Sequence, residues 1–84
     1  MKVNVCTDFK ANPGDTVNFT TPGSTACTLT KLASSVWPFT DGSPLQVPVA
    51  GKATSVKKTL TAGIYSYDVD CCGPAAIAKT VTVS

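Results

Sequence analysis

The amino-acid sequence predicts an all-β protein, a two-sheet β-sandwich of about seven short strands. The chain is rich in threonine and valine, which favour strands, and poor in the long straight-chain residues that favour helices. Glycine and proline recur at short intervals, and between them apolar residues alternate with polar ones. Each strand of a sandwich has one buried and one wet face, so this alternation is its expected signature. With 84 residues the chain is a single domain, residues 1–84.

The first expected strand, residues 3–6, is short and is placed at a sheet edge. It is followed by Asn12-Pro13-Gly14-Asp15, which is typical of a type II turn. Proline presets φ at the first central position, and Gly14 can supply the positive φ that the second central position requires.

Two further strands are expected at residues 16–20 and 25–32, separated by a turn at residues 21–24. Both segments alternate between apolar and polar side chains, as strands with one buried face do. The side chains expected on the buried faces are Val17, Phe19, Cys27 and Leu29.

The middle of the chain, residues 33–48, is less regular and is interpreted as a long, partly buried connection. We expect Trp37 or Phe39 to cover one end of the core. A strand is predicted over residues 53–60, with Lys52, Lys57 and Lys58 pointing outward. Exposed lysines of this kind solvate a sheet edge and prevent strands of different molecules from pairing.

The chain closes with a predicted hairpin around two adjacent cysteines. Its first strand, residues 63–69, alternates Tyr65, Tyr67 and Val69 with polar residues, and its second is residues 80–83. The segment Cys71–Pro74 cannot continue a regular strand, because proline has no amide proton for the ladder. This loop is the first place to expect a site.

Composition argues against several classes of function. The net charge of +2 comes from dispersed lysines, and the chain contains no arginine, glutamate or histidine. A nucleic-acid footprint is therefore not expected, and a hydrolytic triad would lack its base. No apolar run approaches the ~20 residues of a membrane helix, so membrane insertion is not expected either. We expect a protein that is not an enzyme and carries no cofactor.

The four cysteines, at positions 6, 27, 71 and 72, favour disulfides over a structural metal site. Structural zinc sites typically use paired Cys-x-x-Cys spacings, which are absent here. Disulfides in a short chain indicate an extracellular or periplasmic location. Because Met1-Lys2 leads directly into the first strand, the given sequence carries no signal peptide. We expect either that a signal has been removed or that the protein is made in the cytosol.

Three segments resemble the cupredoxins, the blue-copper family that includes plastocyanin. Residues Pro13–Phe19 are similar to the family's Pro-Gly-x-x-Val-x-Phe segment, and Gly63–Tyr67 to its Gly-x-Tyr-x-Phe strand. Residues Thr80–Val83 are similar to the closing Val-Thr-Val strand. The resemblance covers the first third and the last quarter of the chain, and it implies a Greek-key sandwich.

The resemblance also implies where copper ligands would lie. Family spacing places the first histidine at Cys27, the cysteine at Val69, the second histidine at Cys72 and the methionine at Ile77. A blue-copper centre needs two imidazoles and a thiolate in a trigonal arrangement with a weak axial thioether. None of the four ligand types is kept, so the resemblance implies the fold without a type 1 copper site.

Because two of these ligand positions converge on one point in the family, we expect Cys27 to pair with Cys72, and Cys6 with Cys71. The other complete pairing without a bridge between neighbours joins Cys6 to Cys72 and Cys27 to Cys71. Two alternatives stay open: a redox-active disulfide between Cys71 and Cys72, and a thiolate site for Cu(I) or Zn formed by Cys27, Cys71 and Cys72.

The function expected from the sequence is a non-catalytic structural or interaction module, such as a surface, filament or shell component. Its expected partner is another protein or a second copy of itself. The alternative class is an electron-transfer, redox or metal-thiolate protein that uses Cys27, Cys71 and Cys72.

Overall fold

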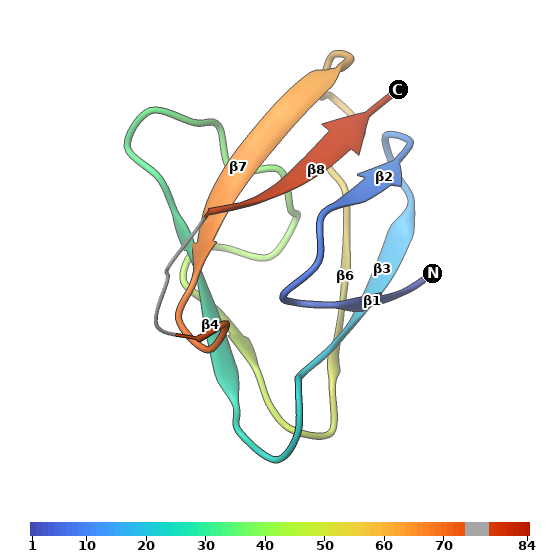
Figure 1. Cartoon of the computed structure of the whole chain (residues 1–84). Helices are drawn as coiled ribbons and strands as arrows, with labels where there is room; N and C mark the ends of the chain where they lie inside the picture. The colour runs from blue at the N-terminus through green and yellow to red at the C-terminus, as the bar shows by residue number, and fades with distance from the viewer. Residues whose placement is uncertain (74–77) are drawn as a thin grey trace.

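Two β-sheets enclose one apolar core in the computed structural model, which describes residues 1–73 and 78–84 (Figure 1). The three-stranded sheet has the order β1-β3-β6, with β1 at Lys2–Asn4, β3 at Thr16–Thr20 and β6 at Lys52–Ser55. The five-stranded sheet has the order β2-β8-β7-β4-β5, with β2 at Phe9–Ala11, β8 at Lys79–Val83, β7 at Gly63–Val69, β4 at Cys27–Lys31 and β5 at Leu45–Val47. The described part of the chain contains no helix long and apolar enough to cross a membrane.

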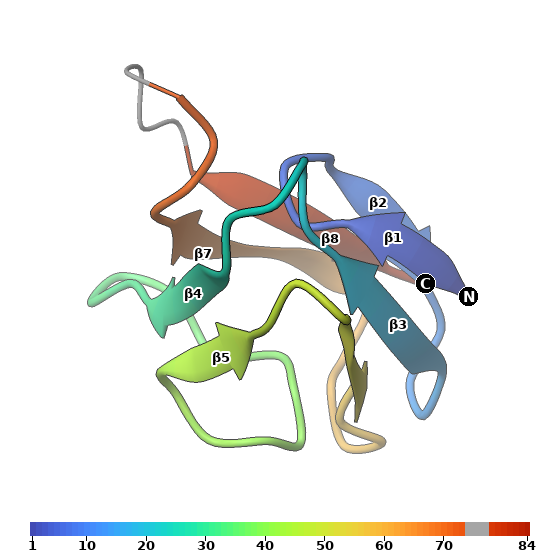
Figure 2. The same ribbon diagram turned by 90° about the horizontal axis from the view of Figure 1, so that it is seen from below.

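The N-terminal segment contributes one strand to each sheet. β1 runs parallel to β3, whereas β2 runs parallel to β8 (Figure 2). The chain therefore passes from one sheet to the other between Asn4 and Phe9, through a turn that contains Cys6. The Asn4 side chain stabilises this turn, because its Oδ1 accepts a hydrogen bond of 2.9 Å from the amide of Cys6.

The expected alternation is present in the long strands. On β3, Val17 and Phe19 are buried, and on β7 the same is true of Tyr67 and Val69. β8 follows the same pattern, so apolar side chains of both sheets meet between them. This burial is the main source of stability that the strands contribute.

The connection before β5 is anchored by aromatic packing, as expected. Phe39 is fully buried and lies edge-on to Phe19, Trp37 and Tyr67, with ring centroids 5.3 Å apart in each pair. Edge-to-face pairs at this distance add to the stabilisation from burial alone. Trp37 or Phe39 was expected to cover one end of the core, and both side chains are buried there.

Residues 1–73 and 78–84 contain eight strands, where about seven were expected. Two of them, β2 and β5, were not predicted as strands. Each has three residues, which allows only one alternation, and prolines at 44 and 48 flank β5. Pairing with longer neighbours, β8 and β4, makes these segments extended.

The strand predicted over residues 53–60 ends at Ser55. After this point Val56 forms a single bridge to Phe39, and the Lys57 amide donates a hydrogen bond of 2.9 Å to the Pro38 carbonyl. The central connection thus lies along the edge of β6 that faces away from β3.

The turn before β3 has the predicted geometry. Gly14 has a φ of 87°, and the amide of Asp15 donates a hydrogen bond of 3.1 Å to the carbonyl of Asn12. The turn is also fixed to the three-stranded sheet, because the Gly14 amide donates to the Val56 carbonyl at 2.9 Å.

Replacing Gly14 with alanine should lower the free energy of unfolding by about 1–2 kcal/mol, because a Cβ is disfavoured at positive φ. The added Cβ would also lie 3.3 Å from the Cγ atom of Lys58. Gly42→Ala is the matched control, since Gly42 has no positive φ and nothing lies within 4 Å of the position that an added Cβ would take. Urea denaturation of both variants measures the effect, and an unchanged midpoint for Gly14→Ala would contradict it.

Candidate functional site

The four cysteines meet at one end of the sandwich. Cys27 is the first residue of β4, Cys71 and Cys72 follow the end of β7, and Cys6 lies in the turn between β1 and β2. Cys27 is buried, and the other three are partly buried against the core. Segments that are distant in the sequence are therefore joined at this end.

The cysteines form two disulfides, Cys6–Cys72 and Cys27–Cys71, each with a Cα–Cα distance of 5.5 Å. The preferred pairing, Cys27 with Cys72 and Cys6 with Cys71, is therefore wrong, and the other complete pairing is present. A bridge between Cys71 and Cys72 is also absent, because both residues are engaged elsewhere.

The register of β4 on β7 explains the correction. Leu29 lies opposite Val69 in this antiparallel pair, and Thr30 lies opposite Asp68. Two steps further along the pair, the same register places Cys71 opposite Cys27. The pair continues past β7, since the Asp70 amide donates to the Thr28 carbonyl at 3.3 Å.

Cys72 is the next residue and lies in the turn that follows β7. It bonds to Cys6, which precedes β2. One bridge thus joins the β7–β8 loop to β4 within the five-stranded sheet. The other joins the same loop to the segment that crosses between the sheets.

The sulfur atoms of Cys6, Cys71 and Cys72 all lie within 4.8 Å of one another. The alternative thiolate set from the sequence contained Cys27 in place of Cys6. Both complete pairings nevertheless joined Cys6 to the loop of Cys71 and Cys72, and the crossing of the N-terminal segment between the sheets brings it there. Val69, at the expected thiolate position, is buried on β7, whereas Ile77 lies outside the described residues.

The carboxylates in the described part of the chain mainly satisfy backbone and side-chain donors. Asp70 accepts a hydrogen bond from the Thr28 amide, Asp8 from the Thr80 amide and Asp15 from the Asn12 amide. Asp15 binds a backbone amide in its own turn, whereas Asp8 binds one far away in the sequence. These three carboxylates therefore have structural partners.

Asp41 links the central connection to β6. Its Oδ1 accepts a hydrogen bond of 2.8 Å from the Thr54 hydroxyl, and its Oδ2 lies 3.4 Å from the Lys52 ammonium. The Thr54 hydrogen bond, with a smaller contribution from the Lys52 charge, holds the pKa of Asp41 below its usual value despite some desolvation. Its backbone carbonyl accepts a hydrogen bond of 2.6 Å from the Trp37 indole.

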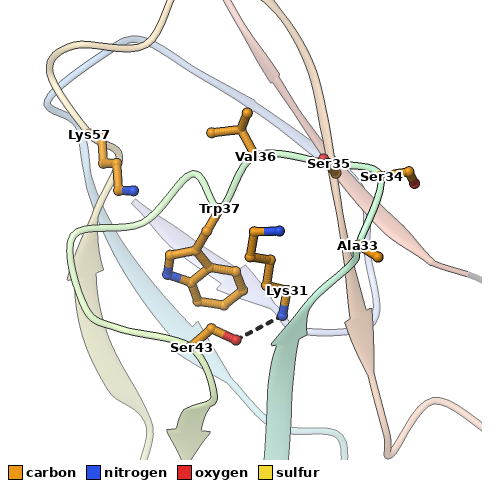
Figure 3. Close-up of a pocket in the computed structure, with 8 residues that line it drawn as sticks. All are labelled: Lys31, Ala33, Ser34, Ser35, Val36, Trp37, Ser43 and Lys57. Atoms are coloured by element: carbon orange, nitrogen blue, oxygen red, sulfur yellow. Dashed lines mark hydrogen bonds between the residues drawn. The ribbon is translucent and has the colours of Figure 1, made fainter.

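A groove that sequence analysis did not predict lies beside this connection. It has a volume of about 720 Å³ and opens between the end of β4, the loop after it and the segments next to β5 and β6 (Figure 3). The lining residues are Lys31, Ala33, Ser34, Ser35, Val36, Trp37, Ser43 and Lys57. No motif identifies this set, because its members come from three separate segments.

Two backbone amides at the groove are bound by serine hydroxyls. The Lys31 amide donates to Ser43 Oγ at 2.8 Å (Figure 3). The Ser66 amide donates to Ser35 Oγ at 3.1 Å. Lys31 lies beyond the part of β4 that pairs with β5, and Ser66 lies beyond the part of β7 that pairs with β4. The serines therefore satisfy amides that no neighbouring strand reaches.

Comparison with known proteins gave no relationship that would assign this chain to a family. No protein-family model matches it, and no curated protein matches it in sequence.

The observed pairing predicts which double variants avoid free thiols. Cys27→Ser with Cys71→Ser should leave the Cys6–Cys72 bridge intact and no reactive thiol. Each bridge closes a loop of 44 or 66 residues, which the chain-entropy model values at roughly 4 kcal/mol. The melting temperature should therefore fall strongly relative to the parent protein in non-reducing buffer, and the difference should shrink in reductant.

The matched control is Cys27→Ser with Cys72→Ser, which removes one partner from each bridge. Alkylation under denaturing conditions should then detect two thiols, or a new bridge between Cys6 and Cys71. Mass spectrometry with fragmentation between residues 71 and 72 gives the pairing of the parent protein directly. A Cys27–Cys72 linkage there would show that the observed register does not hold in solution.

Proposed function

We propose that this protein is a non-catalytic structural or interaction module with a cupredoxin-like, Greek-key sandwich and no type 1 copper site. The observation that carries the proposal is the pair of disulfides at one end of the sandwich. Cys27 and Cys72, the residues at two of the family's ligand positions, are both used in covalent bonds there. A scaffold can keep its fold while the chemistry of its site is replaced.

The convergence of these positions supports the cupredoxin-like assignment. The resemblance implied that position 27 and the loop after position 69 would lie together, and the Cys27–Cys71 bridge joins them. In place of exchangeable ligands, this end has two cross-links. Their effect is to hold the β7–β8 loop against both β4 and the N-terminal crossing.

The side-chain inventory supports a role without catalysis. The sequence has no histidine, arginine or glutamate, so the usual proton-transfer groups are limited to aspartates, lysines and tyrosines. The carboxylates of Asp8, Asp15, Asp41 and Asp70 accept hydrogen bonds that hold turns and strands together. Burial raises the pKa of Tyr67, with a smaller contribution from Asp8, so its phenol stays protonated.

Two disulfides in a small domain are consistent with an extracellular or other oxidising compartment. We propose that the protein acts there, where the cross-links persist and keep a small core folded. For a chain of this size, the total free energy of unfolding is only about 4–13 kcal/mol. Cross-links worth roughly 4 kcal/mol each are then a large part of that margin.

A structural role predicts that both bridges resist reduction. In the folded protein they should remain intact in a glutathione buffer at the cytosolic poise, because structural disulfides have potentials below about −300 mV. Thiol trapping followed by mass spectrometry measures the reduced fraction. A bridge that equilibrates reversibly with this buffer while the fold is retained would favour a redox protein and contradict the proposal.

The proximity of three sulfur atoms supports a second candidate, a metal-thiolate protein in its reduced form. Cys6, Cys71 and Cys72 place their sulfurs within 4.8 Å of one another, which is compatible with shared coordination of one ion. Thiolates favour Cu(I) and Zn(II) over hard cations. The metal ligands of this candidate are Cys6, Cys71 and Cys72, whereas the alternative considered from the sequence used Cys27, Cys71 and Cys72.

If this candidate is correct, fully reduced protein that keeps its fold should bind Cu(I) tightly, and Cys6→Ser should weaken binding more than Cys27→Ser. Competition with a chromophoric Cu(I) chelator under anaerobic conditions measures both affinities. Circular dichroism of each reduced variant serves as the control for folding. Equal weakening by the two substitutions, or no binding at all, would eliminate the Cys6-containing site.

A further inference from the structure

Two serine hydroxyls line the groove beside Trp37. Ser35 Oγ and Ser43 Oγ each accept a hydrogen bond from a backbone amide. A hydroxyl has one proton to donate, and in these serines that proton is not used in the amide contact. Both side chains can therefore donate to a ligand in the groove.

The charged groups of the groove are positive. Lys31 and Lys57 line it, and none of its described lining residues is acidic (Figure 3). Lys31 Nζ donates one hydrogen bond to the Leu32 carbonyl at 3.2 Å, which leaves two of its three protons for other partners. The nearby carboxylate of Asp41 does not neutralise them, because Thr54 and Lys52 engage it.

The same serine contacts argue against an added peptide strand. Recognition by strand addition requires free amides and carbonyls at a sheet edge. At this groove the Lys31 and Ser66 amides are already bound by Ser43 and Ser35. The groove therefore offers side-chain donors in place of a backbone ladder.

The volume and the apolar wall are suited to a ring-shaped ligand. A volume of about 720 Å³ falls within the range of small-molecule sites, and it is far larger than an inorganic oxyanion needs. Val36 is 57% exposed, whereas Trp37 lines the groove with only 6% of its surface exposed. Apolar surface next to hydroxyl and ammonium donors complements a sugar ring that carries an acidic group.

We infer that this groove binds an acidic saccharide, a unit of one or two sugars that carries carboxylate or sulfate. Lys31 and Lys57 pair with the acidic group, Ser35 and Ser43 donate to oxygens of the sugar, and Val36 provides most of the apolar contact with the ring. This inference rests on the proposed function as an interaction module and names its partner class. Since both ammonium groups are near solvent, binding weakens as the salt concentration rises.

The test is a titration of the oxidised protein at low salt with two probes, a glucuronic-acid oligosaccharide and a sulfated disaccharide. Trp37 is the only tryptophan, so its fluorescence reports on the groove without a label. Amide NMR shifts of Lys31, Ser35, Lys57 and Ser66 provide a second readout. Saturable binding of either probe is expected, and the two arms distinguish carboxylate from sulfate recognition.

Lys31→Gln and Lys57→Gln should each weaken binding by about fivefold or more, as expected for loss of a charge-assisted hydrogen bond. Lys10→Gln is the matched control, because it removes the same charge from the exposed side of β2 and should leave affinity unchanged. Melting temperatures of all three variants check that the fold is retained.

Several outcomes would overturn the inference. These are no saturable binding of either probe, equal affinity for a neutral oligosaccharide, or equal weakening by Lys10→Gln. Binding of an oligoglutamate peptide without binding of the saccharides would assign the groove to a different partner class. Failure here leaves the thiol-trapping result unchanged, so it can be told apart from failure of the proposed function.

Discussion

The antiparallel register between β4 and β7 is the constraint on which the rest of this structure depends. It sets Cys71 opposite Cys27, and the adjacent Cys72 then points toward Cys6. Because the two cysteines are neighbours in the chain, a single loop is bound to both β4 and the N-terminal crossing. A shift of one residue in this register would exchange the faces of the whole strand and break both bridges.

The groove forms at the other end of the β4–β7 pair, away from the cysteines. β4 extends past the part that pairs with β5, and β7 begins before the part that pairs with β4, which leaves amides at Lys31 and Ser66 without a strand partner. Backbone amides without a strand partner are usually paired with another acceptor. Ser43 and Ser35 supply it, and both serines line the groove together with Lys31 and Lys57.

Aromatic packing connects these two regions. Phe39 contacts Phe19 of the three-stranded sheet and Tyr67 of the five-stranded sheet, so it holds the central connection between them. Trp37 lies in the same connection and is buried, and its indole N–H donates a hydrogen bond to the backbone carbonyl of Asp41. The groove is thus built on a segment whose position is fixed by buried contacts, although it has little regular secondary structure. Such rigidity lowers the entropic cost of binding a ligand.

The sequence by itself determined the features that depend on local sterics and alternation. The Pro13-Gly14 turn follows from the backbone angles these residues allow, and the burial of Tyr67 and Val69 follows from the period of two in a strand. Only the tertiary structure decided the disulfide pairing and the groove. Both require a register between segments distant in the chain, which no local pattern encodes. The resemblance to cupredoxins predicted that Cys27 lies close to the loop of Cys71 and Cys72. Which of these two cysteines bonds to Cys27 depended on the register of β4 on β7.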